Sequence, residues 1–583
     1  MKSFLKNILS TIIGIVSSIL LLLIIMLVIF SIASTDNEVK IKKNSILKID
    51  LSNNTIVERS PTNPLEAFNF TGEMLDNLEL KEVLDNIEKA KYDDNIVAIY
   101  LNNTIVNAGL SQTEEIRNKL LEFKKTGKRI ISYSEVYSQL SYYLSSVSNS
   151  IYLNPEGVID LKGLSASPMF YKGLLEKLDI DMQIIRHGKF KSAVEPFTLT
   201  KMSAENREQM SLFLNSIADN LMDSIANQRG LTISEVQNHA DQLSLENAKS
   251  CIELNYVDAL MYQDQVNDSL LSLSQSEKLN IISINKYSSV KINTKDISRN
   301  KIAIIYATGS ISSGKGSESS IGSETTAKAI KDAREDKNVK GIVFRINSGG
   351  GSALASDVIW RETILTKEAK IPFVVSMGDY AASGGYYIAC AADSIVANPT
   401  TLTGSIGVFG MIPNLQNFYK NKLGITIDTA NTNKYADMGI NRPLTNYEKR
   451  KIQKSIANVY ETFITHVSEG RNISKSSVDE IGQGRIWTGY DAKKIGLIDT
   501  YGGIEKAIDI ASTLANIDDY RIISLPKKKD PFSEFATKFA SGSNISNILL
   551  DKIGVRTELT KPIENILRRD KVQARLPFTI ELK

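Results

Sequence analysis

The hexapeptide Ile-Val-Ala-Ile-Tyr-Leu at Ile96–Leu101 has a counterpart, Val-Lys-Gly-Ile-Val-Phe, at Val339–Phe344. Each run is short and apolar and lies between amphipathic helical patterns, which is typical of a buried strand in a mostly parallel sheet covered by helices. The match continues to a pair of tyrosines, at 142–143 in the first region and 386–387 in the second. The sequence therefore predicts an α/β chain that contains one module twice.

Both copies have the same order of predicted elements. In the first copy we expect helix 81–90, strand 96–101, helix 112–124 and strand 129–133. In the second we expect helix 326–335, strand 341–346, helix 352–366 and strand 372–377. Two long helices, at 203–228 and 446–469, are expected to follow them.

The composition limits the possible functions. The chain has 583 residues, too many for one ordinary core, and its net charge of +3 gives no argument for nucleic acid as a partner. Two cysteines, Cys251 and Cys390, exclude a disulfide framework. Three histidines leave little material for a metal cluster or a Ser-His-Asp triad, so we expect no metal and no cofactor.

The N-terminal region contains a long uncharged stretch. No charged residue occurs from Ile8 to Ala33, and a helix of that length reaches roughly 39 Å, enough for a hydrocarbon core of about 30 Å. The basic residues that precede it favour a cytoplasmic N-terminus. The alternative is a cleaved signal peptide ending near Ser31-Ile32-Ala33, but the apolar stretch is longer than the usual h-region.

These patterns divide the chain into five parts. We predict a cytoplasmic N-terminus at 1–7, a single transmembrane anchor at 8–34, an N-terminal module at 45–290, a C-terminal module at 300–517 and a C-terminal extension at 518–583.

Only the second copy contains Asp-Tyr-Ala-Ala-Ser-Gly-Gly-Tyr-Tyr, at Asp379–Tyr387. A serine on such a strand-to-helix turn, here Ser383, lies beside free backbone N–H groups and the positive end of a helix. Earlier in the same copy, the strand expected at 341–346 leads into three glycines, 349–351, whose amides could act as donors to an oxyanion. The alternatives are an ordinary N-cap serine and a phosphate-binding loop, but no phosphate-loop motif is present.

Only the first copy contains Gly-Lys-Phe-Lys-Ser-Ala-Val-Glu-Pro-Phe, at Gly188–Phe197. With few histidines available, a serine nucleophile needs another base, and a buried lysine with a lowered pKa can act as one. Lys191 has apolar neighbours that could provide such burial. Glu195 could instead pair with it in a structural ion pair, and His187 is a further candidate base.

The two copies lack complementary residues. The first has Gln139 in the position of Ser383, and the second has Ala436 in the position of Lys191. We therefore expect one active site per chain, built from both modules.

These motifs, together with Leu-Thr-Gly-Ser-Ile-Gly at 402–407 and Gly-Arg-Ile-Trp-Thr-Gly at 484–489, resemble the long form of signal peptide peptidase A, or protease IV, over nearly the whole chain. The resemblance implies two tandem Clp-protease/crotonase-like modules, a nucleophile at Ser383, a general base at Lys191 and a lysine-orienting hydroxyl at Ser405. The first copy has Leu161 in place of Ser405. We assign the oxyanion hole to the amides of Gly384 and Gly351.

The resemblance also implies a biological setting. We expect a homotetramer in the bacterial cytoplasmic membrane, with its catalytic part outside the cytoplasm, that degrades remnant signal peptides. One departure is Gly349, where the family usually has proline, so the loop has more backbone freedom.

The sequence leaves two other functions open. A crotonase-type acyl-CoA enzyme could share this core, but CoA thioesters are cytosolic and we expect an export anchor in this chain. A non-catalytic membrane scaffold would predict loss of the motifs from both copies, whereas each copy lacks a different part.

Overall fold

The computed structural model describes residues 41–60, 76–290, 298–528 and 572–576, together with seven isolated residues between Ser10 and Leu21. Most of the predicted anchor at 8–34 therefore lies outside the described residues. Within the described part of the chain, no helix combines the length and the apolarity that crossing a membrane requires.

The first large sheet belongs to the N-terminal copy. Its six strands are parallel and follow the order β8-β6-β5-β4-β1-β9. Their bounds are β1 Ser45–Ile49, β4 Ile96–Leu101, β5 Arg129–Ser138, β6 Ser150–Asp160, β8 Ala259–Leu260 and β9 Ile281–Ser283.

The second large sheet repeats this order with β20-β16-β15-β13-β10-β21, and β17 and β19 continue from β15. The strands are β10 Lys301–Thr308, β13 Val339–Ser348, β15 Phe373–Ala382, β16 Ser394–Ala397, β17 Leu402–Gly404, β19 Ile486–Thr488, β20 Thr500–Tyr501 and β21 Arg521–Leu525. β21 has the place that β9 has in the first sheet. The second sheet therefore extends beyond the predicted boundary at residue 517.

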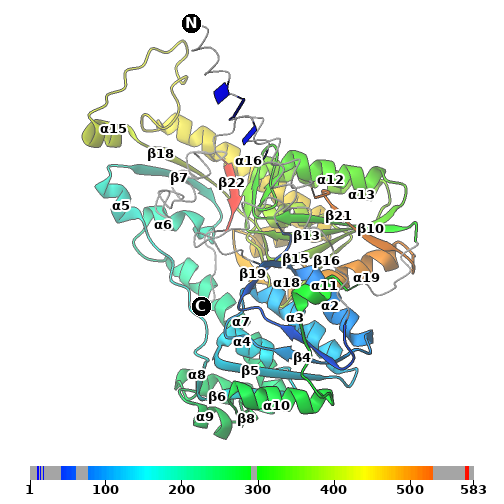
Figure 1. Cartoon of the computed structure of the whole chain (residues 1–583). Coiled ribbons are helices and arrows are strands. Elements are labelled where there is room, and N and C mark those ends of the chain that lie inside the picture. Colours follow the sequence, from blue (N-terminus) through cyan, green and yellow to red (C-terminus); the bar gives the residue numbers. More distant parts are fainter. Residues whose placement is uncertain are drawn as a thin grey trace.

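Helices cover both sheets (Figure 1). In the first copy they are α2 Leu80–Tyr92, α3 Leu110–Lys124, α4 Gln139–Ser145, α7 Ala204–Arg229, α8 Ile233–Asp241, α9 Ala248–Glu253, α10 Gln263–Ser274 and α11 Ile284–Ser288. In the second they are α12 Ser323–Glu335, α13 Ala353–Glu368, α14 Gly384–Ala389, α16 Asn446–Arg471, α17 Lys475–Ile481, α18 Gly489–Lys494 and α19 Ile504–Leu514. A further helix, α15 Gln416–Leu423, follows the strand β18 (Val408–Asn414) and buries none of its residues.

The two long helices begin at the expected caps. The Ser203 side chain accepts a hydrogen bond from the N–H of Asn206 at the start of α7. Thr445 and Glu448 form a reciprocal capping box at the start of α16. α7 ends at Gly230, which has a left-handed conformation.

Two central strands are longer than their sequence patterns predicted. The strands expected at 129–133 and 372–377 continue to Ser138 and Ala382. The register of β5 on β6 shifts between Ser134 and Val136, after which pairing resumes. The end of β15 pairs with the additional strand β17. These added pairings depend on segments distant in sequence, so local periodicity could not predict them.

A third sheet joins the two copies. Its order is β12-β11-β14-β22-β18-β7, with β7 Asp181–His187, β11 Ser310–Ser312, β12 Ser320–Gly322, β14 Gly350–Ser352, β18 Val408–Asn414 and β22 Val572–Arg575. β7 comes from the first copy and pairs antiparallel with β18 of the second along its whole length. This pairing brings the segment that follows His187 to the second sheet. Outside the three sheets, β2 Asn54–Val57 pairs with β3 Asp76–Glu79.

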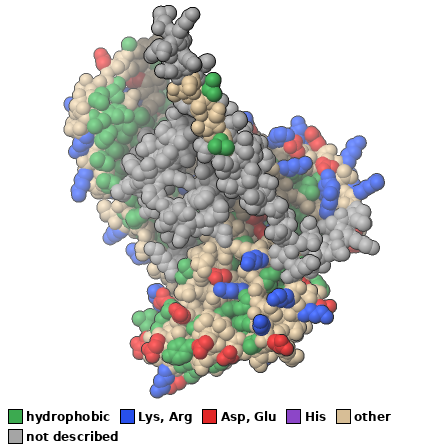
Figure 2. Space-filling model, in the orientation of Figure 1, with side chains coloured by type: hydrophobic (Ala, Val, Ile, Leu, Met, Phe, Trp, Pro, Cys, Tyr) green, Lys and Arg blue, Asp and Glu red, His purple; other side chains and the backbone are tan. Residues whose placement is uncertain are grey.

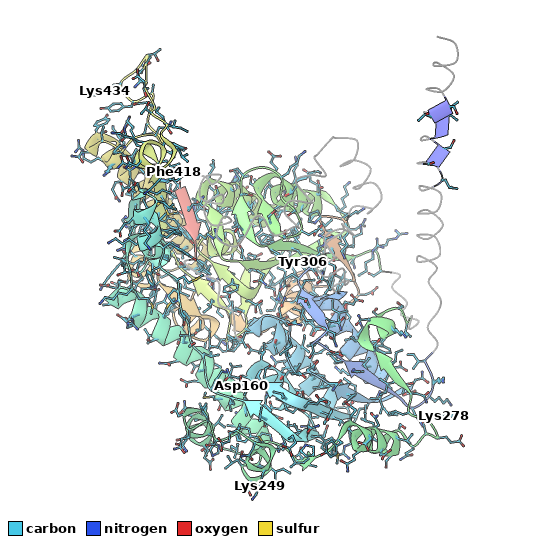
Figure 3. The ribbon with its side chains drawn as sticks, turned by 60° about the vertical axis from the view of Figure 1, so that its left-hand side comes forward. Asp160, Lys249, Lys278, Tyr306, Phe418 and Lys434 are labelled. Carbon is cyan, nitrogen blue, oxygen red and sulfur yellow. The ribbon has the colours of Figure 1, made fainter. Side chains whose placement is uncertain are left out.

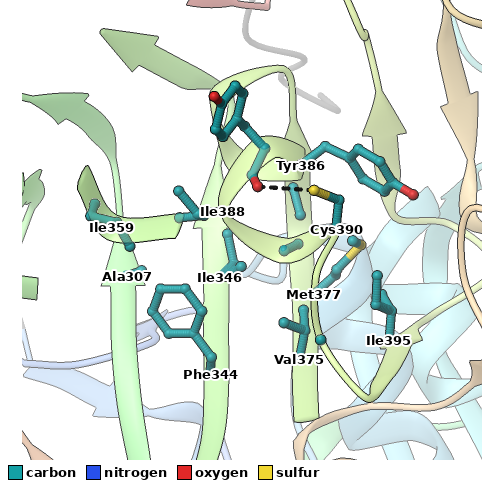
Figure 4. Packing of buried hydrophobic residues seen from close by; sticks show 14 of the residues in the cluster. Ala307, Phe344, Ile346, Ile359, Val375, Met377, Tyr386, Ile388, Cys390 and Ile395 are labelled. Carbon is teal, nitrogen blue, oxygen red and sulfur yellow. Dashed lines mark hydrogen bonds between the residues drawn. The ribbon is translucent and has the colours of Figure 1, made fainter. Parts of the chain in front are cut away.

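The core of the second copy lies directly beneath α14. Figure 4 shows Tyr386, Ile388 and Cys390 packed against side chains of two central strands, Phe344, Ile346, Val375 and Met377. Cys390 is a buried free thiol, as is Cys251 in the first copy. This packing fixes the helix that begins immediately after Ser383.

Candidate active site

Ser383 lies at the junction of β15 and α14. Its backbone has φ 56° and ψ −114°, a region that non-glycine residues rarely adopt, and its N–H donates to the carbonyl of Gly404 at 2.8 Å. The small residues around it allow this sharp turn. Strained conformations of this kind cost free energy and occur often at functional sites.

Lys191 is the nearest ionisable partner of Ser383. Its Nζ lies 2.7 Å from Ser383 Oγ and 3.0 Å from both the side-chain and the carbonyl oxygen of Ser405. It follows β7 and is joined to the second copy because the N–H of Phe190 donates to the carbonyl of Gln483. The structure therefore brings together three residues that the sequence singled out.

The Lys191 amine is fully buried, and its pKa is lowered well below the ordinary value by desolvation. Among the described residues, no carboxylate lies within 4.0 Å of its Nζ. Glu195 instead accepts hydrogen bonds from Ser203 and Asn206. The alternative Lys191–Glu195 ion pair is therefore not formed, and the neutral amine is favoured.

Two glycines make room for Lys191. A Cβ atom on Gly484 would lie 2.7 Å from Lys191 Cβ, and one on Gly407 would lie 3.2 Å from Lys191 Cδ. Both belong to motifs that the sequence comparison singled out, but the packing role of Gly484 was not anticipated. In the sequence, Gly484 is marked only by the motif Gly-Arg-Ile-Trp-Thr-Gly, and this motif does not indicate that Gly484 packs against Lys191.

Ser405 has a positive φ of 50°, and its N–H donates to the carbonyl of Arg485 at 2.7 Å. The hydrogen bond to Arg485 fixes the backbone of Ser405, and both oxygens of Ser405 face the amine of Lys191. A neutral amine has two N–H donors and one lone pair. With both donors directed to Ser405, the lone pair would point to Ser383.

The two amides assigned to an oxyanion hole lie close together. Gly384 is the first residue of α14, so its N–H has no partner within the helix. A Cβ atom on Gly384 would lie 3.1 Å from the nitrogen of Gly351. The neighbouring Gly350 N–H donates to Ser348 Oγ at 3.1 Å and is already occupied.

The corresponding place in the first copy has different side chains. The side-chain oxygen of Gln139 accepts hydrogen bonds from the N–H groups of Lys162 and Gly163, at 3.2 and 2.9 Å. Leu161 is buried in an apolar cluster. This copy therefore presents a glutamine amide and a leucine where the second copy has two serines.

The histidines have other contacts. His187 stacks on Tyr460 with ring centroids 4.1 Å apart, and His466 stacks on Trp360 at 3.5 Å. His239 lies 3.2 Å from the hydroxyl of Tyr256. This geometry therefore does not support His187 as the base.

A buried ion network between the two copies was not foreseen. The Arg345 guanidinium lies 2.8 Å from Glu58 and 2.8 Å from Glu115, so it connects the two copies. Its sequence signal was one arginine within an otherwise apolar strand, and the partners are too distant in sequence to be identified.

Comparison with known proteins agrees with the duplication. The model of peptidase family S49 matches residues 122–277 and 366–518. The serine protease SPPA, chloroplastic, of Arabidopsis thaliana is 36% identical over 82% of this chain and 71% of its own length. Protease 4 of Salmonella typhi is 37% identical over 70% of this chain and 67% of its own length.

Among solved structures, ClpP1 from Listeria monocytogenes is 17% identical and covers 34% of this chain and 91% of its own, with a TM-score of 0.22. The sequence relationships alone are decisive. The family model covers more than half of the chain, in two regions that correspond to the two copies. This chain belongs to peptidase family S49 and is a serine peptidase.

Proposed function

We propose that this serine peptidase is an endopeptidase in which Ser383 is the nucleophile and Lys191 the general base. One observation supports this most strongly: a lysine amine without a carboxylate partner among the described residues lies 2.7 Å from the oxygen of a serine on a strained turn. Desolvation lowers the pKa of Lys191, and a neutral amine can accept a proton near neutral pH.

In the first step, the lone pair of Lys191 Nζ takes the proton of Ser383 as its Oγ attacks the carbonyl carbon of a peptide bond. The N–H groups of Gly384 and Gly351 stabilise the negative charge on the carbonyl oxygen. Lys191 then donates the proton to the departing amine, which leaves an acyl ester on Ser383.

In the second step, Lys191 takes a proton from water, and the resulting hydroxide attacks the ester carbonyl. Collapse of this intermediate releases a carboxylic acid, which loses its proton to water, and Lys191 returns its proton to Ser383. Ser405 positions the amine in both steps, since its two oxygens hold the N–H donors and direct the lone pair to Ser383.

The proposed substrates are apolar peptides, specifically the remnants of cleaved signal peptides. The uncharged stretch from Ile8 to Ala33 supports a membrane anchor, with the two modules on the outer face of a bacterial cytoplasmic membrane. An enzyme held at that surface would meet such peptides where they are released.

We also propose that the chain assembles as a homotetramer. α15 buries none of its residues, and the segment after it projects from the rest of the chain, as Phe418 and Lys434 show in Figure 3. Leu423, Ile425 and Ile427 are exposed there. Exposed apolar side chains that lie together are typical of a surface that another subunit covers. Elsewhere on the face shown in Figure 2, acidic and basic side chains are interspersed.

Active-site labelling tests the catalytic assignment. A fluorophosphonate should attach to Ser383 in the wild-type enzyme and fail to attach in Ser383→Ala and Lys191→Met. Ser476→Ala and Lys189→Ala, which change exposed residues of the same types, should be labelled normally. Normal peptide hydrolysis by Ser383→Ala would overturn the proposal.

A further inference from the structure

One buried side chain, Gln209, connects the segment that carries Lys191 to the second copy. It lies in the second turn of α7, the helix that packs against β19 (Figure 1). Only 1% of Gln209 is exposed, although glutamine is mostly found at the surface of proteins. A buried amide is costly unless its donors and its acceptor are satisfied, so the partners of Gln209 show which parts of the chain it holds together.

The amide nitrogen of Gln209 holds the lysine segment. Its Nε2 lies 3.0 Å from the carbonyl oxygen of Phe190 and 3.0 Å from Ser192 Oγ, so it contacts the residues on both sides of Lys191. Asn206 Oδ1 is a third acceptor at 3.2 Å. Because β7 ends at His187, its pairing with β18 does not extend to these residues, and their position depends on contacts such as these.

The amide oxygen of Gln209 holds the second copy. Its Oε1 accepts a hydrogen bond from the N–H of Ile486 in β19 at 3.4 Å. Ile486 is opposite Gly404 in the pairing of β19 with β17, and the carbonyl of Gly404 accepts the N–H of Ser383. These partners fix the orientation of the amide, since a backbone carbonyl requires its N–H groups and a backbone N–H requires its oxygen.

The neighbours of Gln209 and Ile486 also contact each other. Arg485 Nη2 lies 3.1 Å from Glu208 Oε1, and the guanidinium lies 4.7 Å from the ring centre of Phe190. The carbonyl of Arg485 accepts the N–H of Ser405. The Glu208 side chain is 53% exposed, so this ion pair contributes little. The buried amide is therefore the stronger connection between α7 and β19.

We propose that Gln209 is a positioning residue that sets the separation of Lys191 Nζ and Ser383 Oγ across the two copies. This inference rests on the proposed function, in which these two groups carry out the reaction. Gln209 acts through its hydrogen bonds to Phe190, Ser192 and Ile486. Without them, the lysine segment and the strand beside Ser383 can shift relative to each other, and a displacement of about 1 Å is enough to slow a reaction about 10²-fold.

Steady-state kinetics of the full-length chain on an apolar fluorogenic peptide tests this inference. Gln209→Met keeps the volume of the side chain and removes its hydrogen bonds, so kcat should fall about 10- to 100-fold with KM nearly unchanged. Gln183 provides the matched control. It is also buried, and it also joins the two copies, because its Oε1 accepts the N–H of Leu444 at 2.7 Å. Gln183→Met should keep kcat within about 3-fold of wild type.

The pH profile gives a second measurement that a purely structural role would not change. The Lys191 amine is desolvated in the wild-type enzyme, and a segment held less tightly admits water to it. Water favours the protonated amine, so the rising limb of kcat/KM in Gln209→Met should move to higher pH. Methionine introduces no charge. The charged side chains beside this segment are the same in both enzymes: Arg186, Glu195, Glu208 and Arg485.

Three results would overturn the inference. The first is a wild-type kcat in Gln209→Met. The second is a loss of folded protein while the remaining folded enzyme keeps its kcat and its pH profile, since a structural amide alone predicts this. The third is an equal fall of kcat in Gln183→Met, because any contact between the copies would then have the same effect.

Two further variants complete the test. If Gln209→Met does not fold, Gln209→Asn is compared with Gln183→Asn, because asparagine keeps the amide but is too short to reach Phe190 and Ile486 together; a wild-type kcat would again overturn the inference. Lys191→Met is assayed in parallel. Normal hydrolysis by this variant would refute the proposed function itself, whereas an inactive Lys191→Met beside a normal Gln209→Met would refute the role of Gln209 alone.

Discussion

Lys191 Nζ lies 2.7 Å from Ser383 Oγ, although the two residues are 192 positions apart in the chain. The contact exists because β7 of the first copy pairs with β18 of the second. Neither copy contains both residues, so a chemically competent pair requires the complete chain. The duplication has thus produced two similar scaffolds with one shared site.

Two substitutions of Lys191 should show whether the site needs a positive charge or a neutral base at this position. Lys191→Met should reduce kcat by about 10³-fold or more, since the serine loses its base. Lys191→Arg should be equally inactive, because a guanidinium stays protonated. Kinetics on an apolar peptide would measure both, with Lys189→Ala as the control. Substantial activity in the arginine variant would contradict a neutral base at this position.

The pH dependence of the rate should follow the protonation state of Lys191. Its pKa is lowered well below the ordinary value by desolvation, so kcat/KM should rise with pH as the amine loses its proton and then level off. A profile recorded on wild type would locate this rising limb. A rate that is already maximal in acid and unchanged toward alkaline pH would contradict the assignment.

The lowered pKa of Lys191 also predicts how the free energy of unfolding changes with pH. The unfolded chain binds a proton on Lys191 that the folded chain does not bind, so stability rises with pH between the folded and the unfolded pKa of this group. At neutral pH Lys191→Met should therefore be more stable than wild type, by about 0.5–2 kcal/mol. Chemical denaturation at several pH values would show whether this gain shrinks as the pH approaches the unfolded pKa.

Ser405 should act as a positioning residue. Ser405→Ala removes one of the two oxygens that hold the Lys191 amine, so kcat should fall about 10- to 100-fold with KM nearly unchanged. The carbonyl of Ser405 remains, which is why some activity should persist. A purely structural role would instead lower the yield of folded enzyme and leave the pH profile unchanged, which circular dichroism and the rate profile together would reveal.

More of the fold than of the site could be predicted from the sequence. The strand Ile96–Leu101 was predicted with its observed bounds, because a short apolar run between amphipathic helices leaves few alternatives. The turn at Ser383 was recognised from its small residues. The meeting of Lys191 with Ser405 was expected only from family resemblance, because nothing local in the sequence indicates which distant loops meet. The pairing of β22 with β14 was missed for the same reason.

The buried ion network also shows this limit. Arg345 could be identified as an unusual residue in an apolar strand, but its partners Glu58 and Glu115 follow from the tertiary fold alone. Arg345→Met should cost about 3–5 kcal/mol, because two buried carboxylates lose their counter-charge. Arg361→Met removes an exposed ion pair with Glu368 and should cost less than about 1 kcal/mol. Equal effects of the two changes in urea denaturation would contradict this view.

Gly484 offers a test of how closely the lysine must be held. Gly484 has φ +82°, and a Cβ atom there would lie 2.7 Å from Lys191 Cβ and 2.7 Å from its nitrogen. Gly484→Ala should therefore push Lys191 from Ser383 and lower kcat by about 10²-fold. Gly127 has nearly the same backbone, φ +85°, with nothing within 4 Å of its Cβ position. Gly127→Ala should thus bear the same backbone strain while keeping full activity, so equal losses in the two variants would mean that strain, and not displacement of Lys191, is responsible.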